Sequence, residues 1–186
     1  MLFPALRLPA AFFNSYLIPI CRLCSHSDLG DHRIFAALAI EGSWEDPRLA
    51  SLFSSALAPV KVSRVLIELK DDPRSAFRFF LWSSRRRGFR HIAASFCITA
   101  HILFKGRMYS EAQHVLQQLV SSTRMLPESV DFVDLLQLAG MEFGNSECIF
   151  NPGLFDTLFG VLTNMGLLEE ANECFYRMWS IRVFPS

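Results

Sequence analysis

Apolar residues near the end of the chain recur with the period of an α-helix. After Asn151-Pro152, the apolar positions i, i+3, i+4 and i+7 are Phe155, Leu158, Phe159 and Leu162. After Gly166 the same spacing returns in Ala171, Cys174, Phe175 and Met178. A helix with one apolar stripe packs that stripe against other helices, so the two segments predict an antiparallel pair. We expect Phe175, in the middle of the second stripe, to be a core residue.

The same unit occurs earlier in the chain. A stripe of Phe96, Ala100 and Leu103 is followed by a turn at 106–109 and by a second stripe of Ala112, Val115, Leu116 and Leu119. A degenerate copy has apolar residues within 62–69 and then at Ala76, Phe79 and Phe80. Equivalent alanines are 36 and 59 residues apart, at positions 76, 112 and 171. Residues 121–150 are therefore extra chain, and they include an apolar helix at 130–143. Self-similarity of this kind predicts a helical-repeat array.

Prolines mark the expected helix boundaries in the first half of the chain. Residues 48–58 read as a short helix that Pro59 ends, and residues 60–70 read as an amphipathic helix. Asp72-Pro73 supplies a cap residue and a first-turn proline for the next helix. No run of β-branched residues alternates between paired turns, which argues against strands. The predicted fold class is all-α, an α-solenoid of antiparallel helix-turn-helix repeats (an α-α superhelix) over roughly 48–186.

The beginning of the chain has the composition of a targeting segment. The first 27 residues contain no Asp or Glu, and their only full charges are Arg7 and Arg22. Scattered arginines without acids are typical of an organelle transit peptide, whereas prolines interrupt the apolar run that a secretory signal needs. We predict an unstructured or weakly helical presequence over 1–30 that directs the protein to mitochondria, with the plastid as the alternative.

These signals divide the rest of the chain into segments. We expect an N-terminal helical segment at 31–58, degenerate repeat-like helix pairs at 59–125, an intervening helix and loop at 126–151, and a repeat at 152–186. No stretch reaches the ~18 uninterrupted apolar residues of a membrane span, so we expect no membrane partner.

Charge separates the repeats into two halves. The chain has 51% hydrophobic residues, 19% charged residues and no net charge. Residues 60–125 carry twelve Lys/Arg and four Asp/Glu, a net charge of +8, and residues 126–186 carry two and nine, a net charge of −7. A basic segment can attract polyanions, and it can equally be a solvated helix face. Arg85, Arg86, Arg87 and Arg90 form the densest cluster, between two predicted helices, and are candidate phosphate contacts.

No constellation of catalytic or metal-binding residues emerges. Cys21-x-x-Cys24 is followed by His26 and His32, but without a second cysteine pair the spacing does not predict a zinc site. Glu169 and Glu170 point apart on a helix and are not paired carboxylates. We expect no enzyme, no metal, no cofactor and no small-molecule substrate.

Three blocks stand in the order of a known repeat. The most complete is Phe155-Asp156-Thr157-Leu158, then Asn164-Met165-Gly166-Leu167-Leu168-Glu169-Glu170-Ala171, then Cys174-Phe175-x-x-Met178. Earlier blocks are Asp72-Pro73-x-x-Ala76-x-x-Phe79-Phe80-x-Trp82 with Gly88-Phe89-x-His91, and Arg107-Met108-Tyr109-x-x-Ala112. Together they resemble the pentatricopeptide repeat proteins of plant organelles and predict a P-class-like member that is short or truncated.

The resemblance implies a partner and a set of contact positions. In that family two positions of each repeat read one RNA base, and a third packs against it. These positions fall on Asp156, Ser186 and Gly153 in the last repeat and on Cys97 and Ala94 in the earlier one. A thiol is a poor hydrogen-bonding group, and Gly153 and Ala94 offer little apolar surface. We therefore expect an N-terminal cap of a longer array, or a truncated member, that binds weakly.

Two functions remain open at this point. The first is an RNA-binding protein that acts on single-stranded organellar transcripts in their processing, stability or translation. The second is a helical-repeat adaptor that binds other proteins. A tetratricopeptide array would fit the period, but its signature has a tryptophan early in the first helix of the repeat, and no block here has one at that place.

Overall fold

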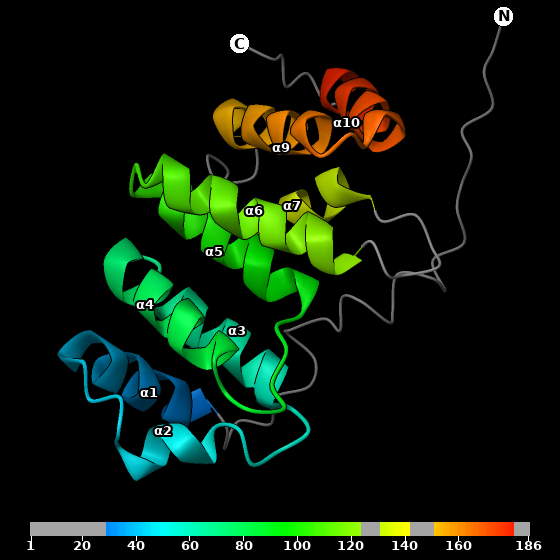
Figure 1. The fold of residues 1–186 in the computed structure, drawn as a ribbon. Coiled ribbons are helices and arrows are strands. Elements are labelled where there is room, and N and C mark those ends of the chain that lie inside the picture. The colour runs from blue at the N-terminus through cyan, green and yellow to red at the C-terminus, as the bar shows by residue number, and fades with distance from the viewer. Residues whose placement is uncertain (1–28, 124–130, 142–150, 181–186) are drawn as a thin grey trace, which may run out of the picture.

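The computed structural model describes residues 29–123, 131–141 and 151–180, and all regular structure in these ranges is helical. Figure 1 shows the helices as a stack that begins with α1 and α2 and ends with α9 and α10. Their bounds are α1 Leu29–Glu41, α2 Pro47–Ser51, α3 Ala58–Glu68, α4 Pro73–Ser84, α5 Ala93–Lys105, α6 Tyr109–Thr123, α7 Phe132–Met141, α9 Pro152–Asn164 and α10 Leu168–Ser180. The prediction of an all-α helical-repeat solenoid is confirmed. The predicted presequence, 1–30, lies almost wholly outside the described residues.

The helices pack as pairs in the order of the chain. The pairs are α3 with α4, α5 with α6, and α9 with α10. Helix α1 packs on α3 and α4, and α5 packs on the same two helices from the other side. Each pair thus covers the apolar surface that its predecessor leaves open, which is how a solenoid builds one continuous core from short units.

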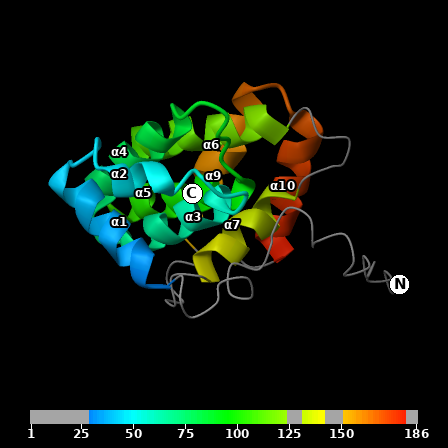
Figure 2. The ribbon, with the colours of Figure 1, turned by 90° about the horizontal axis from the view of Figure 1, so that it is seen from below.

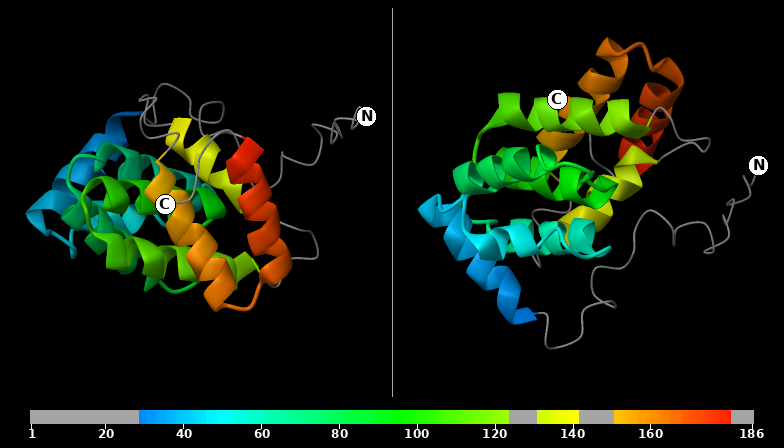
Figure 3. Two further views of the ribbon diagram at one scale, coloured as in Figure 1. Left: turned by 90° about the horizontal axis from the view of Figure 1, so that it is seen from above. Right: turned by 60° about the horizontal axis from the view of Figure 1, so that its bottom comes forward.

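Helix α7 interrupts this order. It packs against α5, and the view from below shows it on the side of α5 that faces away from α6 (Figure 2). Helix α9 packs on α6 and α5, whereas α10 packs on α7 (Figure 3). The extra chain between the last two repeats therefore adds a third helix to the layer of α5 and α6, and the last pair rests on all of that layer.

Caps and prolines begin several of these helices. The Asp72 carboxylate accepts a hydrogen bond from the Ser75 amide at 3.1 Å, and Pro73 fills the first turn of α4. The prediction for Pro59 was wrong, because this proline lies in the first turn of α3 and does not end a helix. A proline is tolerated there because the first-turn amides have no partner within the helix. The short helix α2 ends earlier, at Ser51.

The turn between α5 and α6 depends on a close approach to α4. A Cβ atom on Gly106 would lie 2.4 Å from the Pro73 ring, so only glycine fits at this position. The left-handed residue of the turn is its neighbour Arg107, with a φ of 59°. In the α9–α10 turn the glycine itself adopts the left-handed conformation, since Gly166 has a φ of 73°.

The core runs the length of the stack. Phe79, Phe80 and Phe155 are fully buried within it. In α10 the buried positions are Ala171, Cys174 and Met178, whereas Phe175 is only half-buried and contacts Phe159 at 6.3 Å between ring centroids. The expectation that Phe175 is a core residue was therefore wrong, because α9 and α7 cover a stripe of α10 that leaves this side chain at its edge.

Two phenylalanines of the last pair provide a stability test. Phe155→Ala is expected to lower the free energy of unfolding by about 3–5 kcal/mol, because it leaves a cavity in a closed core. Phe175→Ala is expected to cost clearly less, because its neighbours can relax toward solvent. Urea unfolding followed by circular dichroism measures both, and equal losses would contradict the assignment of the core stripe.

Candidate nucleic-acid interface

The segment between α4 and α5, residues 85–92, carries the densest positive charge, and we call it the arginine loop. Arg85, Arg87 and Arg90 are exposed, and Arg86 is half-buried. None of the four forms an ion pair with an acidic side chain in the described part of the chain. The loop therefore presents positive charge that no neighbouring carboxylate neutralises, which favours polyanions.

Aromatic side chains hold the arginine loop against the stack. The Arg86 guanidinium lies 4.0 Å from the centre of the Trp82 ring and donates a hydrogen bond to the Trp44 carbonyl oxygen at 3.5 Å. Phe89 packs edge-on against Phe53, with 5.0 Å between ring centroids. Stacking of a guanidinium on an indole face is favourable because the ring face is electron-rich. These contacts fix the base of the loop beside α2 and leave three arginines pointing away from the core.

His91 anchors the other end of the arginine loop. Its ring stacks on Phe80 with 4.1 Å between centroids, and its Nε2 donates to the Phe80 carbonyl oxygen at 3.1 Å. Burial lowers the pKa of His91 to about 4, and the hydrogen bond opposes that change only in part. The imidazole is therefore neutral at neutral pH, where it supports the loop and adds no charge to it.

The base-reading positions expected in α5 lie inside the core. Cys97 is 0% exposed, Ala94 is 3% exposed, and burial raises the pKa of the Cys97 thiol to about 12. Helices α3, α4, α6, α7 and α9 all pack against α5, so no face of it is left for a ligand. The expectation that Ala94 and Cys97 face RNA bases is corrected accordingly. The cause is the added helix α7, which binds the side of α5 turned away from its pair and receives a 2.8 Å hydrogen bond at the Leu136 carbonyl oxygen from His101.

The positions expected in the last repeat are closer to the surface. A Cβ atom on Gly153 would lie 2.8 Å from the Phe104 ring, so this glycine lets α9 approach α5. Asp156 is half-buried. Burial is the main cause that raises the pKa of the Cys174 thiol to about 12, and the charges of Asp131 and Asp156 add to this effect. Asp156 thus belongs to an acidic junction of α7, α9 and α10. Ser186 lies outside the described residues.

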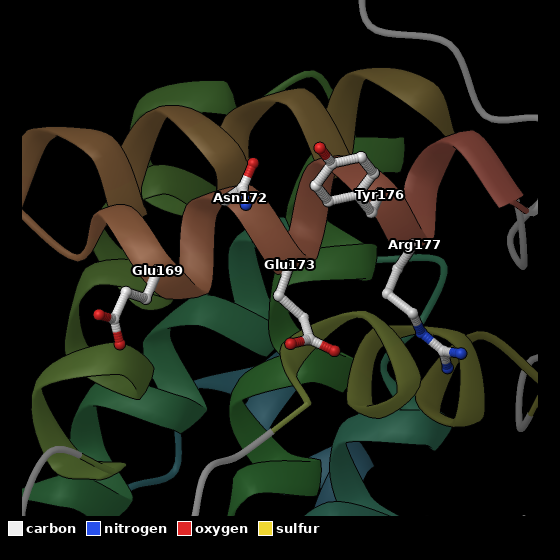
Figure 4. Close-up of a pocket in the computed structure, with 5 residues that line it drawn as sticks. All are labelled: Glu169, Asn172, Glu173, Tyr176 and Arg177. Carbon is white, nitrogen blue, oxygen red and sulfur yellow. The ribbon is translucent and has the colours of Figure 1, made fainter. Parts of the chain in front are cut away.

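Helix α10 borders this junction with a second set of charges. Arg177 forms ion pairs with Asp131 at 3.2 Å and with Asp134 of α7. Arg177 also lines an open groove of about 470 Å³ together with Glu169, Asn172, Glu173 and Tyr176. Figure 4 shows all five side chains on α10, with the carboxylates of both glutamates directed toward the layer below. The arginine loop and this acidic surface lie at opposite ends of the stack.

The described residues contain no group of His, Cys, Asp and Glu side chains placed to hold a metal ion. Of the zinc spacing considered in the sequence, Cys21, Cys24 and His26 lie outside the described ranges, and His32 is buried in α1. In the part of the chain that is described, no helix is long and apolar enough to cross a membrane.

The amino-acid sequence is similar to those of known repeat proteins. Over 142 residues, 76% of this chain, it is 47% identical to a pentatricopeptide repeat-containing protein of Arabidopsis thaliana. The chain belongs to the pentatricopeptide repeat family. Two further members from the same plant, both named as mitochondrial, are 31% and 28% identical over 148 residues each.

The pentatricopeptide repeat relatives are much longer than this chain. The aligned part spans 18% of the first relative and 25% and 26% of the two mitochondrial ones. No protein-family model matches the chain. No solved structure matches it either.

The contacts of His91 predict how the pentatricopeptide repeat stack responds to acid. Because the pKa is lowered from 6.5 to about 4 in the fold, the unfolded chain takes up this proton first as pH falls. The contribution of His91 to the free energy of unfolding is therefore complete above pH 6.5. It falls by up to about 3 kcal/mol as the pH is lowered toward about 4.

His91→Gln keeps a hydrogen-bond donor for Phe80 but cannot titrate. Urea unfolding at several pH values should show a variant that is less stable at pH 7 and less dependent on pH between 6.5 and about 4. His101 is also buried with a lowered pKa and remains in both proteins, so it cancels in the comparison. Parallel pH profiles for the two proteins would contradict the assignment.

Proposed function

We propose that this chain binds single-stranded RNA in an organelle, and that the arginine loop supplies most of the attraction by contacting phosphates. The observation that supports the proposal is the exposed set Arg85, Arg87 and Arg90, held outward by stacked aromatic rings and free of acidic partners among the described residues. Contacts of this kind release counterions from the nucleic acid, so affinity falls steeply with salt.

Base selection is expected to be poor. Helix α5 offers no reader, because Ala94 and Cys97 are buried. In the last repeat Asp156 remains a candidate reader, with Gly153 beside it and Ser186 as its expected partner. A carboxylate in an acidic junction repels phosphate and helps only where a base donor meets it directly. The chain would therefore hold a transcript with little preference for sequence and support its processing, stability or translation as part of a longer assembly.

The site of action is proposed to be the mitochondrion, with the plastid as the alternative. The acid-poor start of the chain supports import into an organelle. The names of several relatives, which call those proteins mitochondrial, support the first of the two.

Removal of the exposed arginines tests the RNA proposal. A variant with Arg85→Gln, Arg87→Gln and Arg90→Gln should bind short single-stranded RNA more weakly, with a salt slope reduced by about 2. Titration by fluorescence anisotropy at low and raised salt measures both quantities. Arg86 is left unchanged because it stacks on Trp82 and belongs to the support of the loop.

A matched control removes the same charge elsewhere. Arg33, Arg74 and Arg107 are also exposed but lie outside the arginine loop, and their replacement by Gln should change the slope far less. Equal effects of the two variants would show that only net charge matters. Strong preference for one RNA sequence that survives raised salt would contradict the sequence-blind binding proposed here, and Asp156→Ala should then weaken it.

Targeting can be tested separately from binding. Residues 1–60 fused to a fluorescent protein should accumulate in mitochondria and lose a segment of about 30 residues, because acid-poor presequences are removed after import. Microscopy and the size of the imported product provide the measurement. A fusion that stays in the cytosol would exclude organelle import, and entry into plastids alone would select the alternative.

A further inference from the structure

Helix α10 presents large aromatic side chains that the described structure leaves exposed. Tyr176 is 65% exposed and Trp179 is 60% exposed, and both belong to α10. Tyr176 lines the open groove of about 470 Å³ with Glu169 and Glu173. Residues three apart lie on the same side of a helix, and an exposed apolar patch is typical of an interaction surface. We call this surface the α10 face.

The α10 face is acidic as well as aromatic. Glu169 and Glu173 are exposed and lie one turn apart. The nearby Arg177 feels the charge of Glu173, but its ion pairs are with Asp131 and Asp134. A carboxylate pair beside two aromatic rings suits a cationic partner, because the carboxylates attract the charge and the ring faces stack on it. Arginine satisfies both requirements with one planar group.

The same molecule carries the complementary surface. The arginine loop has exposed guanidinium groups at Arg85, Arg87 and Arg90, and its support already shows the required chemistry in the stack of Arg86 on Trp82 at 4.0 Å. The loop lies beside α2 at one end of the stack, and α10 lies at the other (Figure 1). The two surfaces therefore cannot meet within one molecule.

We propose that the α10 face of one copy receives the arginine loop of a second copy. Guanidinium groups of the loop would pair with Glu169 and Glu173 and stack on Tyr176 and Trp179. The contact joins two different surfaces, so it is heterologous and leaves a free face at each end of a dimer. It rests on exposed charges, which makes it weak and sensitive to salt.

RNA and a second copy would use the same arginines and would compete. The assembly test is made without RNA, so it does not depend on the proposed RNA function. If self-association fails while RNA still binds, only this inference falls, and the opposite result removes only the RNA proposal.

Charge reversal tests the pairing directly in the full chain. One variant carries Glu169→Lys and Glu173→Lys, and the other carries Arg87→Glu and Arg90→Glu. Sedimentation velocity in about 0.1 M salt, where the Debye length is about 10 Å, should show wild-type mass rising with concentration. The rise should disappear in about 1 M salt, where the Debye length is about 3 Å. Each variant alone should stay monomeric, because like charges then face each other.

The decisive sample is the equimolar mixture of the two variants. In the mixture the native arginine loop of one variant can meet the native α10 face of the other, and the two reversed surfaces can also meet. Association should therefore return to at least half of the wild-type extent. Circular dichroism of each variant confirms that the exposed substitutions leave the fold intact. Wild-type chain that is monomeric at both salts overturns the proposal, and so does a mixture that stays monomeric. Full association of the Arg87→Glu and Arg90→Glu variant alone also overturns it, because α10 faces would then pair with each other.

Discussion

The enclosure of α5 is the constraint on which the rest of the structure depends. Every residue from Ala94 to Leu103 is buried, because α3, α4, α6, α7 and α9 surround this helix. A helix that is apolar on all sides has to be covered on all sides. Its three buried polar side chains find partners. The Ser95 and Ser63 hydroxyls share a hydrogen bond at 2.8 Å, Thr99 donates to the Ser95 carbonyl oxygen at 2.7 Å, and His101 donates to the Leu136 carbonyl oxygen at 2.8 Å. The stack is organised around this one helix, and α7 is the part that closes it.

Closure of α5 leaves its buried side chains without access to a ligand. Helix α7 packs on α5, and Ala94 and Cys97 are buried, so the proposed contacts fall outside α5, on the arginine loop and on α10. One end of the stack carries the arginine loop on a support of Trp44, Phe53 and Trp82. The other end carries α10 with two exposed glutamates and two exposed aromatic rings. The molecule is electrically bipolar, and its net charge of zero conceals this property.

The same separation relates the proposed RNA contact to the proposed self-association. Both depend on exposed guanidinium groups, which bind phosphate or carboxylate through parallel N–H donors. A polyanion offers many such acceptors along its length, whereas α10 offers Glu169 and Glu173. RNA is therefore expected to displace a second copy from the loop when both are present, and assembly would be confined to chain without RNA.

The sequence by itself determined the helices, their pairing and the family. Apolar spacing, the cap at Asp72 and the turns at Gly106 and Gly166 are local signals, and they specify local structure wherever the chain is placed. Charge counting also separated the basic and acidic halves. Local signals do not report which side of a helix is covered, so Ala94 and Cys97 were assigned to a surface and Phe175 to the core. Only the tertiary structure decided these positions, because the packing of α7 on α5 and the hydrogen bond from Arg86 to the Trp44 carbonyl oxygen join residues that are distant in the chain.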